Sequence, residues 1–352
     1  ISLLILGAGF AFVPVIVALA VQSAKGFYHF NFPIYFTYRF IVILPTLLEM
    51  VLFSYMVHVV INNKFVAHAV GITFWVVVFF LRITGIFNYN LLLYGSVPGF
   101  GISDMDGMGH MTGPVSWFNL YWLLFGGLLV ILSGLFYYRG VTSSFKERLQ
   151  LLAERFDKKT RIFTCVLLLI FLPVLGYIYY NVSYLNDFLT KTEQDDRAIL
   201  YEKTLKKYQS LPLPKITRVK MYADLYPDRQ QEFVKAFVSI VNKTTKPIAT
   251  LLLDAEGLSD YAIKMEGKSV QFAYPLLYPR GMFNWFRPKQ DTAEFRLYQF
   301  RNPLAPGDSA ILEINSSIVH KGFENGLYAA NLLHNGTFFT GGLPGLGYDD
   351  DD

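Results

Sequence analysis

One apolar stretch, residues 162–180, reads IFTCVLLLIFLPVLGYIYY and separates two regions of different composition. It carries no charged residue and is about as long as a helix that crosses the hydrocarbon layer of a membrane, which needs roughly 20 residues. Long uncharged runs lie mostly before this stretch, whereas charged residues gather beside it and after it. Hydrophobic residues make up 53% of the 352, and the mean hydropathy is +0.34, so the composition favours a membrane protein.

Four similar stretches precede this one. The sequence predicts five spans, at residues 3–21, 40–61, 65–83, 120–138 and 162–180. Aromatic residues near the span ends are typical of the membrane–water interface, and they are Tyr28, Tyr35, Tyr38, Trp117, Tyr121, Trp122, Tyr137, Tyr138, Tyr177, Tyr179 and Tyr180. We therefore expect a membrane region over residues 1–138 with four spans, a connecting segment at 139–161, and the fifth span at 162–180.

The connecting segment 139–161 predicts the orientation of the chain. It contains seven basic residues: Arg139, Lys146, Arg148, Arg155, Lys158, Lys159 and Arg161. The loop at 85–117 has no Lys or Arg. Because cations accumulate on the cytoplasmic side, 139–161 is predicted to be a cytoplasmic loop, and everything after Asn181 is predicted to be extracytoplasmic.

The second half has two patterns. Residues 181–211 are charged with a sparse apolar stripe, which predicts a helical stalk that ends before Pro212 and Pro214. Residues 212–352 alternate between apolar and polar and contain turn-forming breaks, which predicts an antiparallel, sandwich-like, all-β domain. An alternating run at 216–240, followed by turn residues at 242–247 and an apolar run at 248–253, indicates a hairpin. Further strands are expected at 262–265, 269–274, 294–300, 310–319 and 328–333.

Glu49 lies within the second predicted span. A carboxylate at membrane depth is costly unless it faces a partner or water. The functional interpretation is a transport pathway or a contact between helices. The alternative is a helix end placed slightly wrongly, and the sequence leaves both open.

Other features limit the chemistry. The net charge of +4 is small, and the cations cluster beside apolar runs, so nucleic acid is not expected as a partner. The single cysteine, Cys165, excludes an internal disulfide and a thiolate metal cluster. The loop 103–111 collects Asp, Met and His residues, but its turn-forming composition favours a structural loop over a copper or calcium site. The scattered histidines form no His-Glu-x-x-His motif, and no phosphate-binding Gly-Lys-Ser or Gly-Lys-Thr loop is present.

Several short motifs carry a resemblance to a known family. The stretch 94–139, with SDMDG at 103–107, Gly109-His110 and WFNLYW at 117–122, resembles the last part of the membrane region of fused bacterial proteins, mostly from Bacteroidota. These proteins join an ABC-type permease region to a zinc metallopeptidase of the aminopeptidase N family. DLYPD at 224–228, VNKT at 241–244, PGD at 306–308 and NGTFF at 335–339 are similar to the amino-terminal β domain of that peptidase. The resemblance extends over essentially the whole chain.

The resemblance implies that residues 1–138 are permease-like and that 212–352 are a truncated peptidase β domain. The chain is then a piece of a longer, multi-pass protein of the bacterial inner membrane, with its carboxyl-terminal domain in the periplasm. Zinc and a peptide substrate are expected for the full-length protein, but this piece lacks the catalytic motifs, so no catalytic, cofactor-binding or metal-binding residue is assigned in it. Asn335, Phe338 and Phe339 are expected at the rim of the peptide site.

The expected partners are the lipid bilayer, an ABC ATPase subunit and a second permease half. An alternative function is a transporter or export-complex permease subunit whose external β domain binds a partner without catalysis. A third is a membrane-anchored scaffold with a degenerate peptidase domain.

Overall fold

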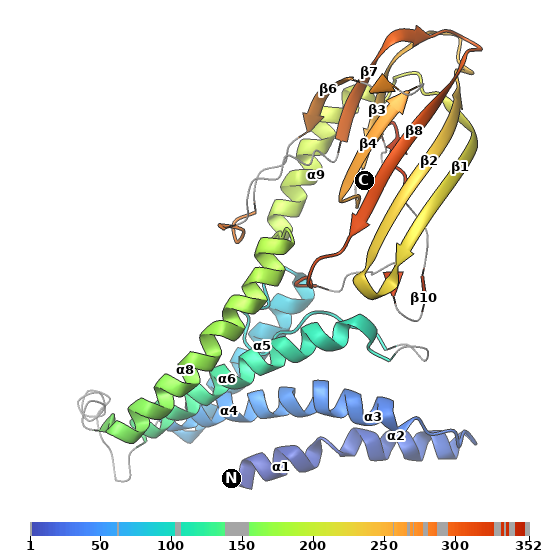
Figure 1. Cartoon of the computed structure of the whole chain (residues 1–352). Coiled ribbons are helices and arrows are strands. Elements are labelled where there is room, and N and C mark those ends of the chain that lie inside the picture. The colour runs from blue at the N-terminus through green and yellow to red at the C-terminus, as the bar shows by residue number, and fades with distance from the viewer. Residues whose placement is uncertain are drawn as a thin grey trace. The chain divides into compact units, whose positions relative to one another are not determined.

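A computed structural model describes residues 2–61, 63–102, 107–137, 155–255, 257–265, 268–269, 271–276, 281–286, 295–326, 332–333, 336–337 and 342–348. The chain divides into two compact units. We call Ile1–Val182 with Glu324–Leu327 the membrane unit, and Ser183–Phe323 with Tyr328–Asp352 the β unit. Long apolar helices followed by antiparallel sheets confirm the predicted fold class (Figure 1).

The first half of the chain is helical. Its elements are α1 (Ser2–Phe10), α2 (Val13–Ala24), α3 (Phe32–Tyr38), the π-helix η1 (Arg39–Ile43), α4 (Leu44–Val60), α5 (Lys64–Thr84), η2 (Gly109–Met111), α6 (Thr112–Phe136), α8 (Lys158–Tyr179) and the π-helix η3 (Tyr180–Leu185). Five stretches are long and apolar enough to cross a membrane: Ile5–Ala24, Phe32–Val60, Lys64–Thr84, Gly109–Phe136 and Lys158–Leu185. The chain is thus a multi-pass membrane protein in the part that the structure describes.

The second and fourth spans begin earlier than predicted, at Phe32 and Gly109 instead of residues 40 and 120. Pro33 and Pro114 fall in the first turn of α3 and of α6. A helix needs no N–H donor there, because the first four amides of a helix have no partner within it. Each proline is therefore compatible with the first turn of its helix, and the helix can begin before it.

In an irregular turn of the second span, a neighbouring helix supplies the hydrogen-bond donor that a backbone carbonyl lacks. Pro45 has no N–H, so it cannot donate to the carbonyl of Ile41, which lies four residues earlier. The buried side chain of Asn119, on α6, donates to that carbonyl through Nδ2. Thr46 Oγ1 donates to the next carbonyl, that of Val42, at 2.8 Å. The π-helix and the proline are thus accommodated without leaving the Ile41 carbonyl unpaired inside the membrane.

The β unit contains two principal sheets. Its strands are β1 (Lys215–Tyr226), β2 (Gln231–Val241), β3 (Ile248–Asp254), β4 (Asp260–Met265), β5 (Lys268–Ser269), β6 (Gln271–Leu276), β7 (Phe295–Leu304), β8 (Ser309–Val319), β9 (Leu332–Leu333), β10 (Gly336–Thr337) and β11 (Gly345–Leu346). The sheet orders are β1-β2-β8-β4-β5 and β11-β3-β7-β6, and β9 pairs with β10. Every pairing is antiparallel.

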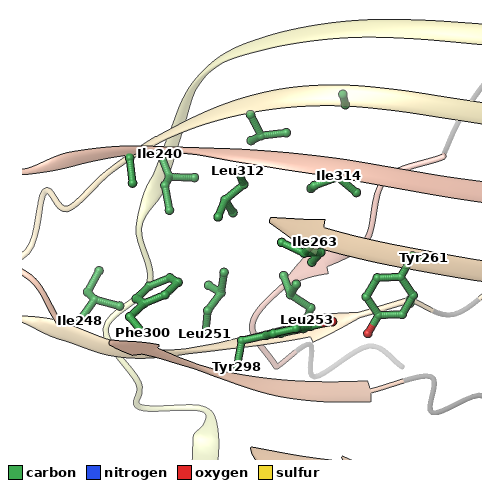
Figure 2. Close-up of a cluster of buried hydrophobic side chains, with 14 of the residues drawn as sticks. Ile240, Ile248, Leu251, Leu253, Tyr261, Ile263, Tyr298, Phe300, Leu312 and Ile314 are labelled. Atoms are coloured by element: carbon green, nitrogen blue, oxygen red, sulfur yellow. The ribbon is translucent and has the colours of Figure 1, made fainter. Parts of the chain in front are cut away.

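The core of the β unit lies between these two sheets (Figure 2). Alternate residues of β2 and β8 point inward, for example Ile240 and Leu312. The other sheet contributes side chains such as Leu251, Leu253 and Phe300. A period of two with one buried face is what a half-buried strand requires, and it matches the alternation seen in the sequence.

A helix, α9 (Lys191–Leu205), also belongs to the β unit. Thr190 and Glu193 form a capping box that fixes its first turn. Its buried Tyr201 and Leu205 pack with Leu252 and Phe295 in a second, smaller core. The apolar stripe of α9 is therefore covered by the β unit.

The predicted hairpin between 233–240 and 248–253 is wrong. β2 pairs with β1 and β8, whereas β3 pairs with β7 and β11 in the other sheet. The connection between them crosses from sheet to sheet because it is organised by Asn242, which is fully buried. Asn242 Nδ2 donates to the carbonyls of Lys246 at 2.8 Å and Leu304 at 2.7 Å, and its Oδ1 accepts from Thr244. The hairpin lies instead between β1 and β2.

Candidate functional site

Glu49 is the predicted site residue that the structure describes. It lies in α4, inside the span Phe32–Val60, and its side chain is only 1% exposed. Its Oε1 has no hydrogen-bond partner among the described residues. A carboxyl group without a hydrogen-bond partner is costly in so apolar a place.

A loop after α5 covers the carboxyl group. The Tyr94 hydroxyl donates to the backbone carbonyl of Glu49 at 2.9 Å. Burial, and to a lesser degree the charge of Glu49, raises the pKa of the Tyr94 phenol above its usual range, so the hydroxyl stays a donor. Gly95, with φ of +66°, follows directly, and a Cβ there would lie 3.1 Å from Glu49 Oε2 and 3.5 Å from the Trp75 ring. Glycine thus allows the loop backbone to lie against the carboxylate.

Aromatic rings enclose the same region. They are Phe53, Phe74, Trp75, Tyr94, Trp122 and Phe125, which contact one another pairwise. Phe53 and Phe74 stack with 3.9 Å between ring centroids, and Tyr94 and Trp122 meet edge to face at 5.2 Å. Rings exclude water and leave the carboxyl group with few ways to be solvated. The arrangement suits a group that binds a proton or a cationic partner.

Asparagine side chains hold this loop in place. Asn90 N donates to Asn325 Oδ1 at 2.9 Å, and Asn325 Nδ2 donates to the Asn88 carbonyl at 2.6 Å. Asn90 Nδ2 returns a bond to the Asn325 carbonyl, and the Ser96 hydroxyl donates to Asn90 Oδ1 at 2.6 Å. Asn325 belongs to Glu324–Leu327, the short later segment that forms part of the membrane unit. Residues more than 200 positions apart in the sequence thus fix the cover over Glu49.

Two aromatic residues expected at the interface have another role. Tyr121 and Trp122 are buried in α6, and the Tyr121 hydroxyl donates to the Leu91 carbonyl at 3.0 Å while Trp122 Nε1 donates to the Ser96 carbonyl at 2.9 Å. Their interpretation as interface anchors is wrong, because the fourth span begins at Gly109 and places both inside it. Sequence reasoning missed them for the same reason.

The other predicted features are placed only in part. Asn335, Phe338 and Phe339 lie outside the described residues, as do Ser103–Asp106. In the described part of the 103–111 loop, Met108 and Met111 are buried. Across the described ranges, no group of three or more His, Cys, Asp or Glu side chains is arranged to hold a metal ion.

Comparisons with known proteins give distant structural likenesses. No protein-family model matches the chain, and no curated protein sequence matches it. Among solved structures, a mutant of an M1 zinc metallopeptidase from Deinococcus radiodurans is similar at 14% identity and a TM-score of 0.23, both with a bound Tyr-Ser-Ala substrate and without it. The match covers 30% and 33% of this chain, and only 21% and 24% of the metallopeptidase. A TM-score this low carries no inference about the activity of this chain.

Proposed function

We propose that this chain is the membrane anchor and non-catalytic β domain of a bacterial protein that joins an ABC-type permease region to a zinc aminopeptidase of the aminopeptidase N family. Peptide hydrolysis and the zinc ion belong, in this proposal, to a region of the full-length protein beyond residue 352. The chain described here contributes attachment to the bilayer and a folded support for that region.

The observation that carries the proposal is the joint at Asn242. Two motifs of the resemblance, VNKT at 241–244 and PGD at 306–308, meet there, although about 60 residues separate them in the sequence. Asn242 N donates to the Asp308 carbonyl at 2.9 Å, and Gly307 N donates to the Asn242 carbonyl at 2.8 Å. Motifs that pack together in one joint are under a common structural constraint, so their joint presence supports the resemblance more than either motif alone.

The activity is tested on the full-length gene product in native membranes. We expect hydrolysis of an aminoacyl-coumarin amide that is lost with a chelator and returns with Zn²⁺. Membranes that contain a product ending at residue 352 are the matched control and should be inactive. A full-length product that is folded and inserted but inactive with every aminoacyl substrate would contradict the proposal.

The β unit is proposed to lie in the periplasm. The basic segment 139–161 supports this orientation, because cations resist translocation. In a Cys165→Ser background, Lys243→Cys should react with a membrane-impermeant maleimide in intact spheroplasts, whereas Lys159→Cys should react only after lysis. The opposite pattern would place the β unit in the cytoplasm and remove the basis for an exported peptidase.

A second function, a permease subunit that couples transport to a partner ATPase, is favoured by the buried Glu49. If the carboxyl group serves transport, Glu49→Gln should lower ATP hydrolysis by the complex purified from the native host. Glu232→Gln changes a buried carboxyl group of the β unit and serves as the control. Equal ATP hydrolysis in the wild type and in Glu49→Gln would exclude a transport role for the carboxylate.

A further inference from the structure

Two histidines from neighbouring helices lie in contact at one end of the membrane unit. His58 is in the last turn of α4, and His68 is in the second turn of α5. Their ring centroids are 4.5 Å apart, and 3.3 Å separates His58 Nε2 from His68 Nδ1. Asn63 fixes the start of α5, because its Oδ1 accepts from Phe65 N at 2.9 Å and Val66 N at 3.3 Å. The helix cap therefore fixes the position of the His68 imidazole.

The hydrogen bond on the other side of the first ring defines its tautomer. His58 Nδ1 lies 2.7 Å from the backbone carbonyl of Ser54. A carbonyl only accepts, so Nδ1 carries the proton and the lone pair of the neutral ring is on Nε2, toward His68. Metal-binding histidines commonly hold their second N–H on a carbonyl in this way, which orients the ring and makes the free nitrogen a better ligand.

The distance between the two nitrogens fits a tetrahedral metal ion. Zinc–nitrogen bonds are about 2.0–2.1 Å long, so two ligands at the tetrahedral angle lie about 3.3–3.4 Å apart. The observed 3.3 Å meets this distance without movement of either helix. An octahedral edge with the same bond length would be about 2.9 Å, so the pair fits Zn²⁺ better than a metal that requires octahedral geometry.

The pair opens into a groove of the membrane unit. The groove has a volume of about 420 Å³ and is lined by the two histidines with Met50, Ser54, Gly71, Ile72, Trp75, Val76 and Phe79. A side chain at Gly71 would meet nothing within 4 Å, so there is space beside the rings. Both histidines are exposed and lie within two turns of a helix end.

Only two protein ligands are present at this place. Within the described ranges, no third His, Cys, Asp or Glu side chain joins them to form a metal-holding group. Two of the four tetrahedral positions would then remain for water or another oxygen ligand, one more than in a catalytic zinc site with three protein ligands. The affinity should be weaker than that of structural sites with four protein ligands.

We propose that His58 Nε2 and His68 Nδ1 form a Zn²⁺ site that joins the end of α4 to the start of α5. To bind the ion, the neutral His68 ring carries its proton on Nε2 and presents the Nδ1 lone pair. No net proton release from the neutral pair is needed. Binding weakens in acid, since protons and the metal compete for the same nitrogens. Without metal, the same contact is an N–H···N hydrogen bond from His68 to His58.

The test uses the whole chain in lipid nanodiscs and Zn²⁺ added against a chromophoric chelator. We expect one equivalent of Zn²⁺ to bind, and Co²⁺ to give the strong visible bands of a tetrahedral complex that Zn²⁺ then displaces. His58→Ala and His68→Gln should each weaken Zn²⁺ binding by about tenfold or more, since loss of even an outer-shell partner commonly costs that much. His29→Ala removes another exposed histidine of the membrane unit and should leave binding unchanged.

A second measurement needs no variant and so does not depend on the folding of one. Cu²⁺ bound to the wild type should show two imidazole nitrogens by pulsed electron paramagnetic resonance. Absence of Cu²⁺ binding to the wild type, or a single imidazole nitrogen, would overturn the proposal. In the Zn²⁺ titration, binding that survives both His58→Ala and His68→Gln in folded protein would also overturn it. The last result would place the ion elsewhere on the chain.

Discussion

Leucine side chains have opposite exposures in the two units of the chain. Leu169, in α8, is 75% exposed, whereas Leu251, in β3, is 1% exposed. In the membrane unit the apolar surface faces lipid, so its helices gain little from packing one leucine on another. In the β unit the apolar residues leave water only by meeting one another. The comparison teaches that burial holds the β unit together, while contacts between particular helices hold the membrane unit.

The units share a device where the backbone is irregular. In each, a buried asparagine donates to a carbonyl that regular structure does not satisfy: Asn119 to Ile41 in the membrane unit, and Asn242 to Lys246 and Leu304 in the β unit. An unsatisfied buried carbonyl costs about 1–3 kcal/mol, so both asparagines are expected to matter.

The largest effect is expected from a cavity in the core of the β unit. Leu251→Ala should lower the free energy of unfolding of this unit by about 3 kcal/mol, since it removes buried methyl groups from a packed interior. The measurement is thermal melting of the whole chain in nanodiscs, followed by the circular dichroism of the sheet. Leu169→Ala, the matched leucine that faces lipid, should change stability by about 0.5 kcal/mol or less. Equal losses of stability in Leu251→Ala and Leu169→Ala would contradict the inference that burial stabilises only the β unit in this way.

Asn242→Ala should rank second, with a loss of about 2 kcal/mol in the same melt. The change leaves the Lys246 and Leu304 carbonyls without their donor at the joint between the sheets. Lys243→Ala, at the exposed neighbouring position, is the control and should have almost no effect. If Asn242→Ala were as mild as its control, water would have to satisfy both carbonyls.

A smaller effect is expected in the membrane unit. Asn119→Ala should cost about 1 kcal/mol, because hydrogen bonds between membrane helices contribute that much or less. Pro45→Ala restores a backbone N–H for the Ile41 carbonyl, so Asn119→Ala should cost clearly less in that background. Unfolding by a denaturing detergent, applied to both single variants and the double variant, measures the difference. Additive losses would show that Asn119 does not act through Ile41.

The smallest effect concerns pH. Burial raises the pKa of Glu232, which is 4% exposed, so this carboxyl group supports the folded state below its unfolded pKa, and that support is lost as pH rises through the folded pKa. Glu232→Gln should therefore raise the melting temperature slightly at about pH 8 and have little effect at about pH 4.

Glu313, in the same sheet, has a pKa shift of the opposite sign. A side-chain hydrogen bond from Lys235 lowers the pKa of Glu313, so its contribution is present above its unfolded pKa and is lost as pH falls. Glu313→Gln should thus lower the melting temperature at about pH 8. Shifts of the same sign in the two variants would contradict these assignments.

Much of the fold can be predicted from the sequence, because each unit has a pattern with its own period. Uncharged runs of about 20 residues identify spans, and alternation identifies strands such as β2 and β8. Such patterns do not identify the partners of an element. The stripe on α9 predicts a helix, but nothing local shows that Tyr201 packs on Phe295, which lies more than 90 residues later. The sequence predicts a hairpin between β2 and β3 because an asparagine in a turn cannot be distinguished, from the sequence, from a buried asparagine such as Asn242 that joins two sheets.

The candidate site divides in a similar way. Glu49 stands out because a carboxylate is rare in an apolar run, and the structure places it under a loop. The groups that cover it, Tyr94 and Gly95, are about 45 residues away, and Asn325, which holds the loop, is far beyond them. Such contacts depend on tertiary structure, so no motif or spacing could have predicted them.

The outer strand β1 stands at the end of its sheet order, with β2 as its neighbour, and its residues are exposed almost throughout. Among the described strands it pairs only with β2, so its outer edge is a template onto which a second copy could add a strand. The exposed apolar side chains of Ile216, Val219 and Tyr222 would favour such an addition. Lys215, Arg218 and Lys220 are interspersed among them. When two such edges approach, these cations repel each other, so we expect them to disfavour aggregation through this edge. Replacing these three cations with neutral residues should lower the solubility of the protein while the β unit still folds.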